Sequence, residues 1–263
     1  MVHETVTLLH GAYHPRNAVK VEKEGAFTLH SFEDGATLKV RTRFLPKLFS
    51  EKWTQLPLRS NQGGTFLFQT SSGKVIVRPA FPGYPKLEIL ASLLKHRARI
   101  ESPILELNAP QSGSSLIVTR FYSGTRLQDV RSDLLNADIN KIAILLAKKL
   151  ARLHVAGYVH RHAHSKNILV HDGYPILIDP KRMHYAEPLH PTELKRCFQG
   201  ILLNPPAFLH YTYDLENVHI AVNDQMPLAK IHAAYLEEYE KAWARRQVRD
   251  EREKVKLLKA KSK

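Results

Sequence analysis

The sequence predicts an α+β fold in which a mostly β first half is followed by a mostly helical second half. Short strand-like runs at residues 5–9, 26–30 and 37–40 are separated by the turn signals Glu24-Gly25 and Asp34-Gly35. From about residue 138 onward, leucines and isoleucines recur at helical spacing instead. Residues 153–182 combine both patterns, because they predict a helix end, a tight loop, a strand, a turn and a second strand that ends in an aspartate.

The composition is that of an ordinary globular protein that can bury a sizeable core. The chain has 263 residues, of which 43% are hydrophobic and 24% are charged. It has no apolar run of transmembrane length and no signal-peptide pattern at its start. Its one cysteine, Cys197, excludes an internal disulfide and is typical of a reducing compartment. We therefore expect a cytoplasmic protein.

The charge is strongly positive and is concentrated in part at the C-terminus. A net charge of +14 and a pI near 9.8 predict anionic partners. Residues 241–263 contain ten lysines and arginines against three acids, and Trp243 and Val248 suggest an apolar side. This segment is either a solvated terminal helix or a contact with a membrane surface. We expect an N-lobe at 1–121, a C-lobe at 122–240 and a basic helix or tail at 241–263.

The tight loop runs from His160 to Asn167 with the sequence HRHAHSKN, and Asp179 follows the apolar strand 176–178. This order resembles the catalytic segment of protein kinases, in which H-R-D-x-x-x-x-N precedes a strand and a metal-holding aspartate. The resemblance implies a bilobal protein-kinase-like fold. His162 stands where that pattern has its catalytic aspartate, and Pro180 replaces the residue after the metal-holding aspartate.

Further N-lobe motifs agree with this resemblance. Paired glycines and two predicted strands around Ser72-Gly73 suggest a hairpin whose backbone N–H groups approach phosphate oxygens, although a plain hairpin is equally consistent. The VIVR strand places Arg78 where kinases have a phosphate-pairing lysine, and arginine is a wider cation than lysine. Glu88, on a predicted helix, is either the ion-pair partner of Arg78 or a solvated glutamate.

The strand 116–121 and the segment Tyr122-Ser123-Gly124 are predicted to form the hinge, with a nucleotide base lying against residues 118–122. A helix should follow, capped by Asp138 or Asn140 and stopped by Gly157. Its predicted core face comprises Ile142, Leu145, Leu146, Leu150 and Leu153. Residues 194–203 and 214–240 are also predicted to be helical.

Together, LHxxGYVHRHxHxxNILV, LIDPKR and VIVR resemble the lipopolysaccharide core kinase family, which includes the Kdo and heptose kinases of Gram-negative bacteria. The resemblance implies an ATP- and Mg²⁺-dependent enzyme at the inner membrane that phosphorylates a sugar hydroxyl of lipopolysaccharide core or another anionic glycolipid. It implies His162, Arg78 and Glu88 as catalytic residues, and Asn167 and Asp179 as metal ligands. The nucleotide would be held by Gln62, Gly63, Gly64, Thr65, Arg78, Val118, Phe121 and Tyr122.

Three alternatives stand beside an active kinase. A neutral imidazole at position 162 can accept a hydroxyl proton, yet loss of both the aspartate and the lysine is also expected of a pseudokinase that binds nucleotide or a partner without catalysis. The alternating His160, His162 and His164 suggest a zinc site, which would require a rigid cage. A nucleic-acid-binding module is suggested by charge only, and the sequence lacks its motifs.

Overall fold

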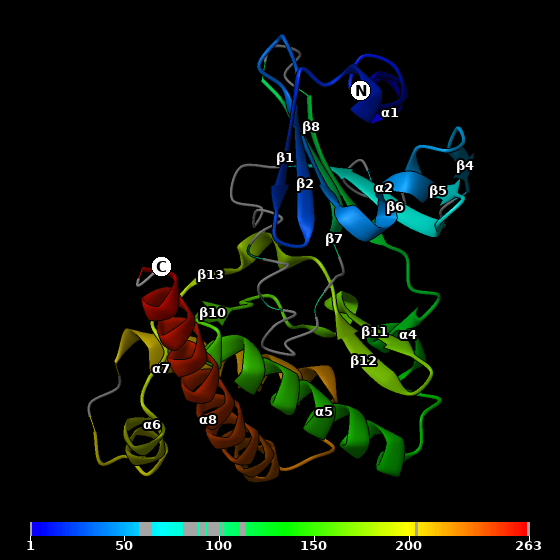
Figure 1. Cartoon of the computed structure of the whole chain (residues 1–263). Helices are drawn as coiled ribbons and strands as arrows, with labels where there is room; N and C mark the ends of the chain where they lie inside the picture. Colours follow the sequence, from blue (N-terminus) through cyan, green and yellow to red (C-terminus); the bar gives the residue numbers. More distant parts are fainter. Residues whose placement is uncertain are drawn as a thin grey trace. The chain divides into compact units, whose positions relative to one another are not determined.

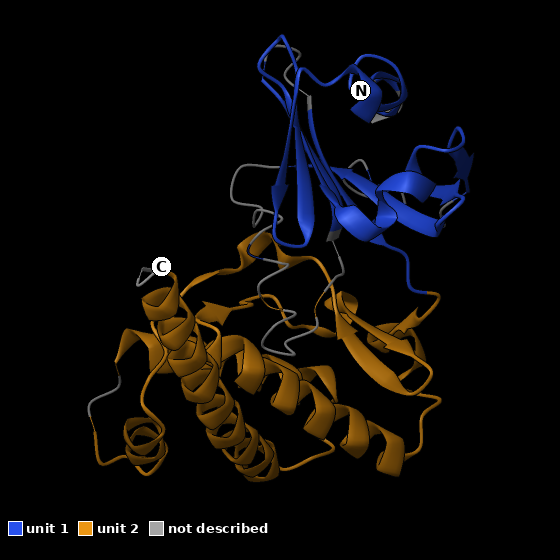
Figure 2. Cartoon of the chain, in the orientation of Figure 1, with its two compact units in different colours: residues 1–91, 101–122 blue, residues 92–100, 123–263 orange. Residues whose placement is uncertain are grey.

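The computed structural model describes residues 2–57, 65–80, 89, 93, 100, 103–110, 114–202 and 205–261. The chain divides into two compact units, coloured separately in Figure 2. The first comprises residues 1–91 and 101–122, and the second comprises residues 92–100 and 123–263. The predicted tail, 241–263, therefore belongs to the second unit, where it continues a long helix to Lys261.

The first unit is built on an eight-stranded antiparallel sheet in the order β1-β2-β3-β7-β8-β6-β5-β4 (Figure 1). The strands are β1 (Lys20–Glu24), β2 (Phe27–Ser31), β3 (Thr37–Arg41), β4 (Thr54–Leu56), β5 (Phe66–Thr70), β6 (Gly73–Pro79), β7 (Pro103–Ala109) and β8 (Ser114–Arg120). Among the described residues of this unit, the helices with established bounds are α1 (Val2–His10) and α2 (Leu45–Leu48), with 3₁₀ turns at Pro15–Asn17 and Thr42–Phe44.

The predicted hairpin around Ser72-Gly73 is β5–β6, in which Thr70 is paired with Gly73. Gly73 has a φ of 103°, a left-handed conformation that glycine adopts without steric cost. The paired glycines fall between β4 and β5, at residues outside the described ranges. The strands predicted at 26–30 and 37–40 are found as β2 and β3, whereas β1 was not predicted. All five residues of β1 are exposed, so its sequence carries no apolar alternation.

The strand predicted at residues 5–9 is wrong, because this segment forms the helix α1. Its β-branched residues favour a strand locally, but Val6 and Leu9 lie three apart and are both buried. Together with Tyr13 they pack into the hydrophobic core of the sheet. Burial on one helical face therefore outweighs the local strand propensity.

The second unit is mostly helical. Among its described residues, the helices with established bounds are α4 (Leu127–Val130), α5 (Asn136–Val155), α6 (Pro191–Phe198), α7 (Pro206–Ala221) and α8 (Leu228–Lys261), with 3₁₀ turns at Ser165–Asn167 and Pro180–Arg182. Five short strands, β9 (Thr125–Arg126), β10 (Tyr158–Val159), β11 (Ile168–His171), β12 (Tyr174–Leu177) and β13 (His184–Tyr185), form a three-stranded sheet β12-β11-β9 and a pair β10-β13. Among the described helices, none combines the length and apolar character that crossing a bilayer requires.

Helix α5 follows the predicted periodicity. Its N-terminal cap differs from the prediction, whereas its C-terminal end agrees with it. Leu135 is the N-cap residue, so neither Asp138 nor Asn140 caps the helix; Asp138 instead lies in the first turn. Gly157 has a φ of 88° and follows the helix end as predicted. A Cβ at Gly157 would lie 2.8 Å from the Tyr185 ring, so the position also requires a small residue.

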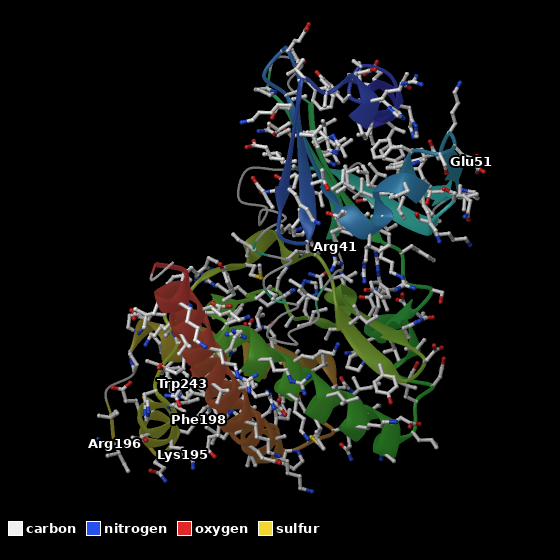
Figure 3. The ribbon with its side chains drawn as sticks, in the orientation of Figure 1. Arg41, Glu51, Lys195, Arg196, Phe198 and Trp243 are labelled. Atoms are coloured by element: carbon white, nitrogen blue, oxygen red, sulfur yellow. The ribbon has the colours of Figure 1, made fainter. Side chains whose placement is uncertain are left out.

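The predicted helix at 214–240 is interrupted, since α7 ends at Ala221 and α8 begins at Leu228. Asn223 and Asp224 both have positive φ there, the conformation that Asn and Asp tolerate best after glycine. The helix predicted at 194–203 is found as α6 and ends at Phe198. Phe198, labelled with Trp243 in Figure 3, packs edge-on to Phe208, with ring centroids 4.9 Å apart. Aromatic side chains thus fill the space between these helices.

Candidate functional site

The hairpin β11–β12 brings the two predicted metal ligands to the same end of a small sheet. Asn167 immediately precedes β11, and Asp179 lies two residues after β12. The turn between the strands has positive φ at Asp172 and Gly173, which suits a two-residue hairpin connection. The Ile178 amide donates to the Asn167 carbonyl over 2.9 Å, so the antiparallel pairing continues to the residue before Asp179.

The His162 side chain lies between these two residues. The Asn167 Nδ2 group is 2.8 Å from His162 Nδ1, and it also donates to the His162 carbonyl over 3.1 Å. The same imidazole nitrogen is 3.6 Å from Asp179 Oδ2. A fourth group, His164, packs its ring at right angles to that of His162, with centroids 4.3 Å apart. The structure therefore brings together His162, Asn167 and Asp179, all from the second unit.

The contacts of Asn167 Nδ2 with His162 Nδ1, with the His162 carbonyl and, over 3.3 Å, with His164 Nε2 favour one tautomer of the His162 ring. An amide NH₂ can only donate, so His162 Nδ1 accepts and Nε2 carries the hydrogen of a neutral imidazole. Burial lowers the pKa of His162 to about 4, with further lowering by His164, Lys181 and Arg182, while Asp179 opposes the shift. The pKa of His164 is also lowered, chiefly by burial. His162 is therefore neutral near pH 7, and its Nε2–H is a donor.

The loop backbone is held by Asp214, a residue that the sequence analysis did not identify. Asp214 lies on α7 and is fully buried. Its two carboxylate oxygens accept the amide hydrogens of His160 over 2.8 Å and Arg161 over 2.7 Å. Arg161 has a φ of 55°, which a long side chain seldom adopts without such support. A spacing of 54 residues between Asp214 and His160 leaves no local sequence signal for this contact.

His154, at the end of α5, completes this network. Its Nε2 lies 3.1 Å from Asp214 Oδ2, and its Nδ1 lies 2.8 Å from the Tyr235 hydroxyl. The Tyr211 ring stacks on the imidazole, with centroids 4.2 Å apart. Burial lowers the pKa of His154, although Asp214 opposes the shift. A neutral ring that donates through Nε2 and accepts at Nδ1 satisfies both partners.

Asn167 and Asp179 carry oxygen groups of the kind that magnesium prefers. With Asn167 Nδ2 engaged by His162, the amide oxygen Oδ1 remains the group suited to a cation, and Asp179 adds a carboxylate. Magnesium prefers such oxygen ligands and takes the rest of its shell from water and phosphate. Lys181 Nζ lies 3.1 Å from Asp179 Oδ2, so a bound cation would compete with this ion pair. Among the described residues, no three His, Cys, Asp or Glu side chains form a metal-binding group, so the alternating histidines form no zinc cage.

The predicted nucleotide residues lie in the first unit. Arg78 is on β6 and pairs in register with Ile117 of β8. Val118, on β8, is fully buried in the hydrophobic core and is paired in register with Val77 of β6 and Leu105 of β7. Phe121 and Tyr122 follow β8 and are half-buried, and so is Thr65, which precedes β5. The remaining predicted residues, Gln62, Gly63, Gly64 and Glu88, lie outside the described residues.

Comparison with known proteins identifies the architecture. No family model matches the chain, and no curated protein matches it. In contrast, 1452 chains of solved structures are similar to it. One is the kinase PK-1 of Cydia pomonella granulovirus, with a TM-score of 0.50 and 15% sequence identity, over 66% of this chain and 68% of that chain. The chain therefore has a protein-kinase-like α+β fold, with a β-sheet unit followed by a helical unit.

Proposed function

We propose that this protein is an ATP- and Mg²⁺-dependent kinase that phosphorylates a sugar hydroxyl of an anionic glycolipid, such as lipopolysaccharide core, at the cytoplasmic face of the inner membrane. The observation that carries the proposal is the contact of one imidazole, that of His162, with both Asn167 and Asp179. It brings an amide and a carboxylate to one point on a protein-kinase-like scaffold. The resemblance in residues 142–182 supplies the acceptor class.

In this proposal each group has a defined task. Asn167 Oδ1 and the Asp179 carboxylate hold magnesium, which supplies neutralisation of phosphate charge when bound. Arg78 and Glu88 form the ion pair that orients the phosphates. The backbone of residues 62–65 covers the phosphates, and residues 118–122 receive the base. Asp214 is a positioning residue, since it holds the loop backbone next to His162.

Transfer joins the acceptor hydroxyl oxygen to the γ-phosphorus while the bond from that phosphorus to the bridging oxygen of ADP breaks. Because the transition state is loose, positioning and charge neutralisation supply most of the rate. His162 accepts the hydroxyl proton only at Nδ1, and only when the Asn167 amide releases that nitrogen. Otherwise the proton passes to solvent and His162 donates its Nε2–H to an anionic oxygen. In this proposal, proton transfer to His162 therefore depends on whether the Asn167 amide occupies its Nδ1 atom.

Cationic side chains around the loop suit an anionic acceptor. Arg161 and Lys166 lie in the loop, and Lys181 and Arg182 follow Asp179. His184, two residues further, packs against His210 of α7, with ring centroids 4.9 Å apart. This concentration of positive charge beside the candidate metal ligands attracts phosphorylated or carboxylated substrates.

One observation favours the second candidate, a pseudokinase. Asp179 already pairs with Lys181, and the Nδ1 lone pair of His162 is already engaged by Asn167. A protein that binds nucleotide or a partner without transfer would retain this arrangement. The two functions differ in turnover and not in fold.

Turnover of purified protein with ATP, magnesium and core oligosaccharide separates the two candidates. The His162→Ala variant should lose about 10²–10⁴-fold of turnover in a kinase, since it removes the candidate general base as well as the group that contacts Asn167. A His219→Ala variant, which removes an imidazole from the far end of α7, should keep wild-type turnover. No phosphorylated product from the wild-type protein, with ATP binding intact, would identify a pseudokinase.

Binding of ATP tests the metal site independently of turnover. The Asp179→Ala variant should lose the magnesium-dependent part of ATP affinity in either candidate, because the carboxylate is the charged ligand. Titration of ATP with and without magnesium measures this difference. An unchanged magnesium-dependent affinity would remove Asp179 from the nucleotide site.

A further inference from the structure

The last turns of α8 extend beyond the contacts that hold the rest of the helix. Ile231, Tyr235 and Tyr239 are fully buried, and Arg246 donates to the Val155 carbonyl at the end of α5 over 2.7 Å. In contrast, every residue at positions 251–260 is exposed. A short helical end without burial is only marginally stable in water, so a surface that covers it would stabilise it.

Trp243 does not belong to the exposed apolar side of this helix. Its ring stacks on Tyr239, with centroids 6.3 Å apart, and lies edge-on to His190. Trp243 and Val248 are five positions apart, which separates them by roughly 140° around the helix axis. The two residues therefore face different surroundings.

The exposed apolar stripe is instead formed by Ala244, Val248, Val255 and Leu258, which lie within about 80° of one another around the axis. Val248 is 53% exposed, Val255 42% and Leu258 68%. The first part of the stripe contributes to a shallow groove of ≈ 400 Å³ that is lined by Ala244, Arg245, Val248, Arg249 and Arg252. Glu251 falls within the stripe, and its carboxylate is 3.8 Å from Lys254.

Basic residues follow the stripe on both sides. Arg245, Arg252 and Lys259 lie on one flank, and Lys254 lies on the other. A second copy of this helix would place cations opposite cations, which disfavours a coiled coil between two chains. Nucleic acid would engage the cations and leave the apolar stripe unused. An anionic bilayer uses both features, since long Lys and Arg stems let apolar side chains enter the interface while the charges remain at the headgroups.

We infer that residues 244–261 of α8 lie on an anionic phospholipid bilayer, with Val248, Val255 and Leu258 at the boundary between headgroups and acyl chains. This docking rests on the inner-membrane location in the proposed function, but vesicle binding does not depend on phosphoryl transfer, so failure of one can be distinguished from failure of the other. It also predicts salt-sensitive binding, because exposed charges are screened within a Debye length.

Co-sedimentation of the full chain with vesicles tests this surface. Vesicles of phosphatidylcholine with a third phosphatidylglycerol should bind the protein, and pure phosphatidylcholine vesicles should not. The Leu258→Asp variant should bind about tenfold or more weakly, because it removes a buried apolar contact and adds a repelled charge. Leu257→Asp is the matched control: it adds the same charge at a similarly exposed leucine, about 100° away from Leu258 and on the opposite side of the helix from Val248.

The two variants distinguish binding through the apolar stripe from attraction by charge alone. Loss of binding in Leu258→Asp with near wild-type binding in Leu257→Asp supports the stripe. Equal loss in both variants would show attraction by charge alone and would overturn the inference. Absence of wild-type binding, or a dimer that Leu258→Asp dissociates in sedimentation, would overturn it as well. Circular dichroism of both variants verifies that the helical unit remains folded.

Discussion

Asp214 shows how one buried carboxylate can set the backbone of a whole loop. It accepts hydrogen bonds from two consecutive amides, and it contacts His154 with a third bond. The positive φ of Arg161 lies within this contact, so the carboxylate balances a local backbone cost. The position of His162, one residue later, follows from it.

The Asp214→Asn variant should lower the free energy of unfolding by about 1–3 kcal/mol. An asparagine has one acceptor oxygen, so its NH₂ group would face a backbone N–H in a buried site. A lower midpoint of urea unfolding measures this loss, provided that the dependence of the unfolding free energy on urea concentration is unchanged. Glu216→Gln, on an exposed face of the same helix, makes the same change of charge and should stay within about 0.5 kcal/mol. Equal midpoints for the two variants would contradict the role of Asp214.

At the scale of elements, α5 and α8 are joined by an ion pair as well as by apolar packing. The Glu238 carboxylate of α8 lies 2.8 Å from Arg152 Nε of α5 and 2.5 Å from Arg245 Nη2 of its own helix. Burial raises the pKa of Glu238, but the hydrogen bonds from Arg152 and Arg245 outweigh it, so the pKa is lowered overall. The carboxylate is thus ionised between two cations.

Replacing Glu238 with alanine should therefore lower the free energy of unfolding by about 1–2 kcal/mol, since both arginines are partly exposed and can turn to water. Thermal or urea unfolding measures the change. Glu237→Ala removes the neighbouring exposed glutamate, whose pair with Lys241 lies on the helix surface, and should cost less than about 0.5 kcal/mol. A loss in Glu238→Ala no larger than in this control would show that the pair contributes nothing to helix packing.

At the scale of the whole molecule, histidines couple stability to pH. Burial lowers the pKa of five histidines that lie outside the candidate metal site: His10, His30, His154, His210 and His232. In the unfolded chain these side chains take up protons below about pH 6.5. The folded protein binds fewer protons in that range. The contribution of these histidines to the free energy of unfolding should therefore be fully present above pH 6.5 and should decrease as the pH falls.

Urea unfolding between pH 7.5 and pH 5 measures this dependence. His232→Phe should flatten it, because His232 titrates next to Phe198, with ring centroids 4.7 Å apart, and phenylalanine keeps the aromatic contact. A fully shifted histidine contributes at most about 1.4 kcal/mol per pH unit. A midpoint that stays constant or rises on acidification would refute the neutral burial of these side chains.

The sequence by itself determined the features that arise from local spacing. The helical period of α5, the hairpin β11–β12 and the interval between Asn167 and Asp179 are all set within about forty residues, and the catalytic-segment pattern rests on them. A fold of the protein-kinase type was predictable for this reason. The hairpin brings Asn167 and Asp179 to the same end of the small sheet, whereas the contact of His162 with them depends on the loop backbone that Asp214 holds.

Only the tertiary structure decided which residues support that segment. Asp214 reaches the loop from 54 positions away, α1 is helical because its buried face packs on the sheet, and β1 pairs through its backbone without an apolar pattern. The Trp243 ring packs on Tyr239, so the exposed apolar residues of α8 include Val248, Val255 and Leu258 and not Trp243. Contacts between segments that are distant in the sequence produce no regular spacing of residue types. Local sequence patterns therefore could not predict them.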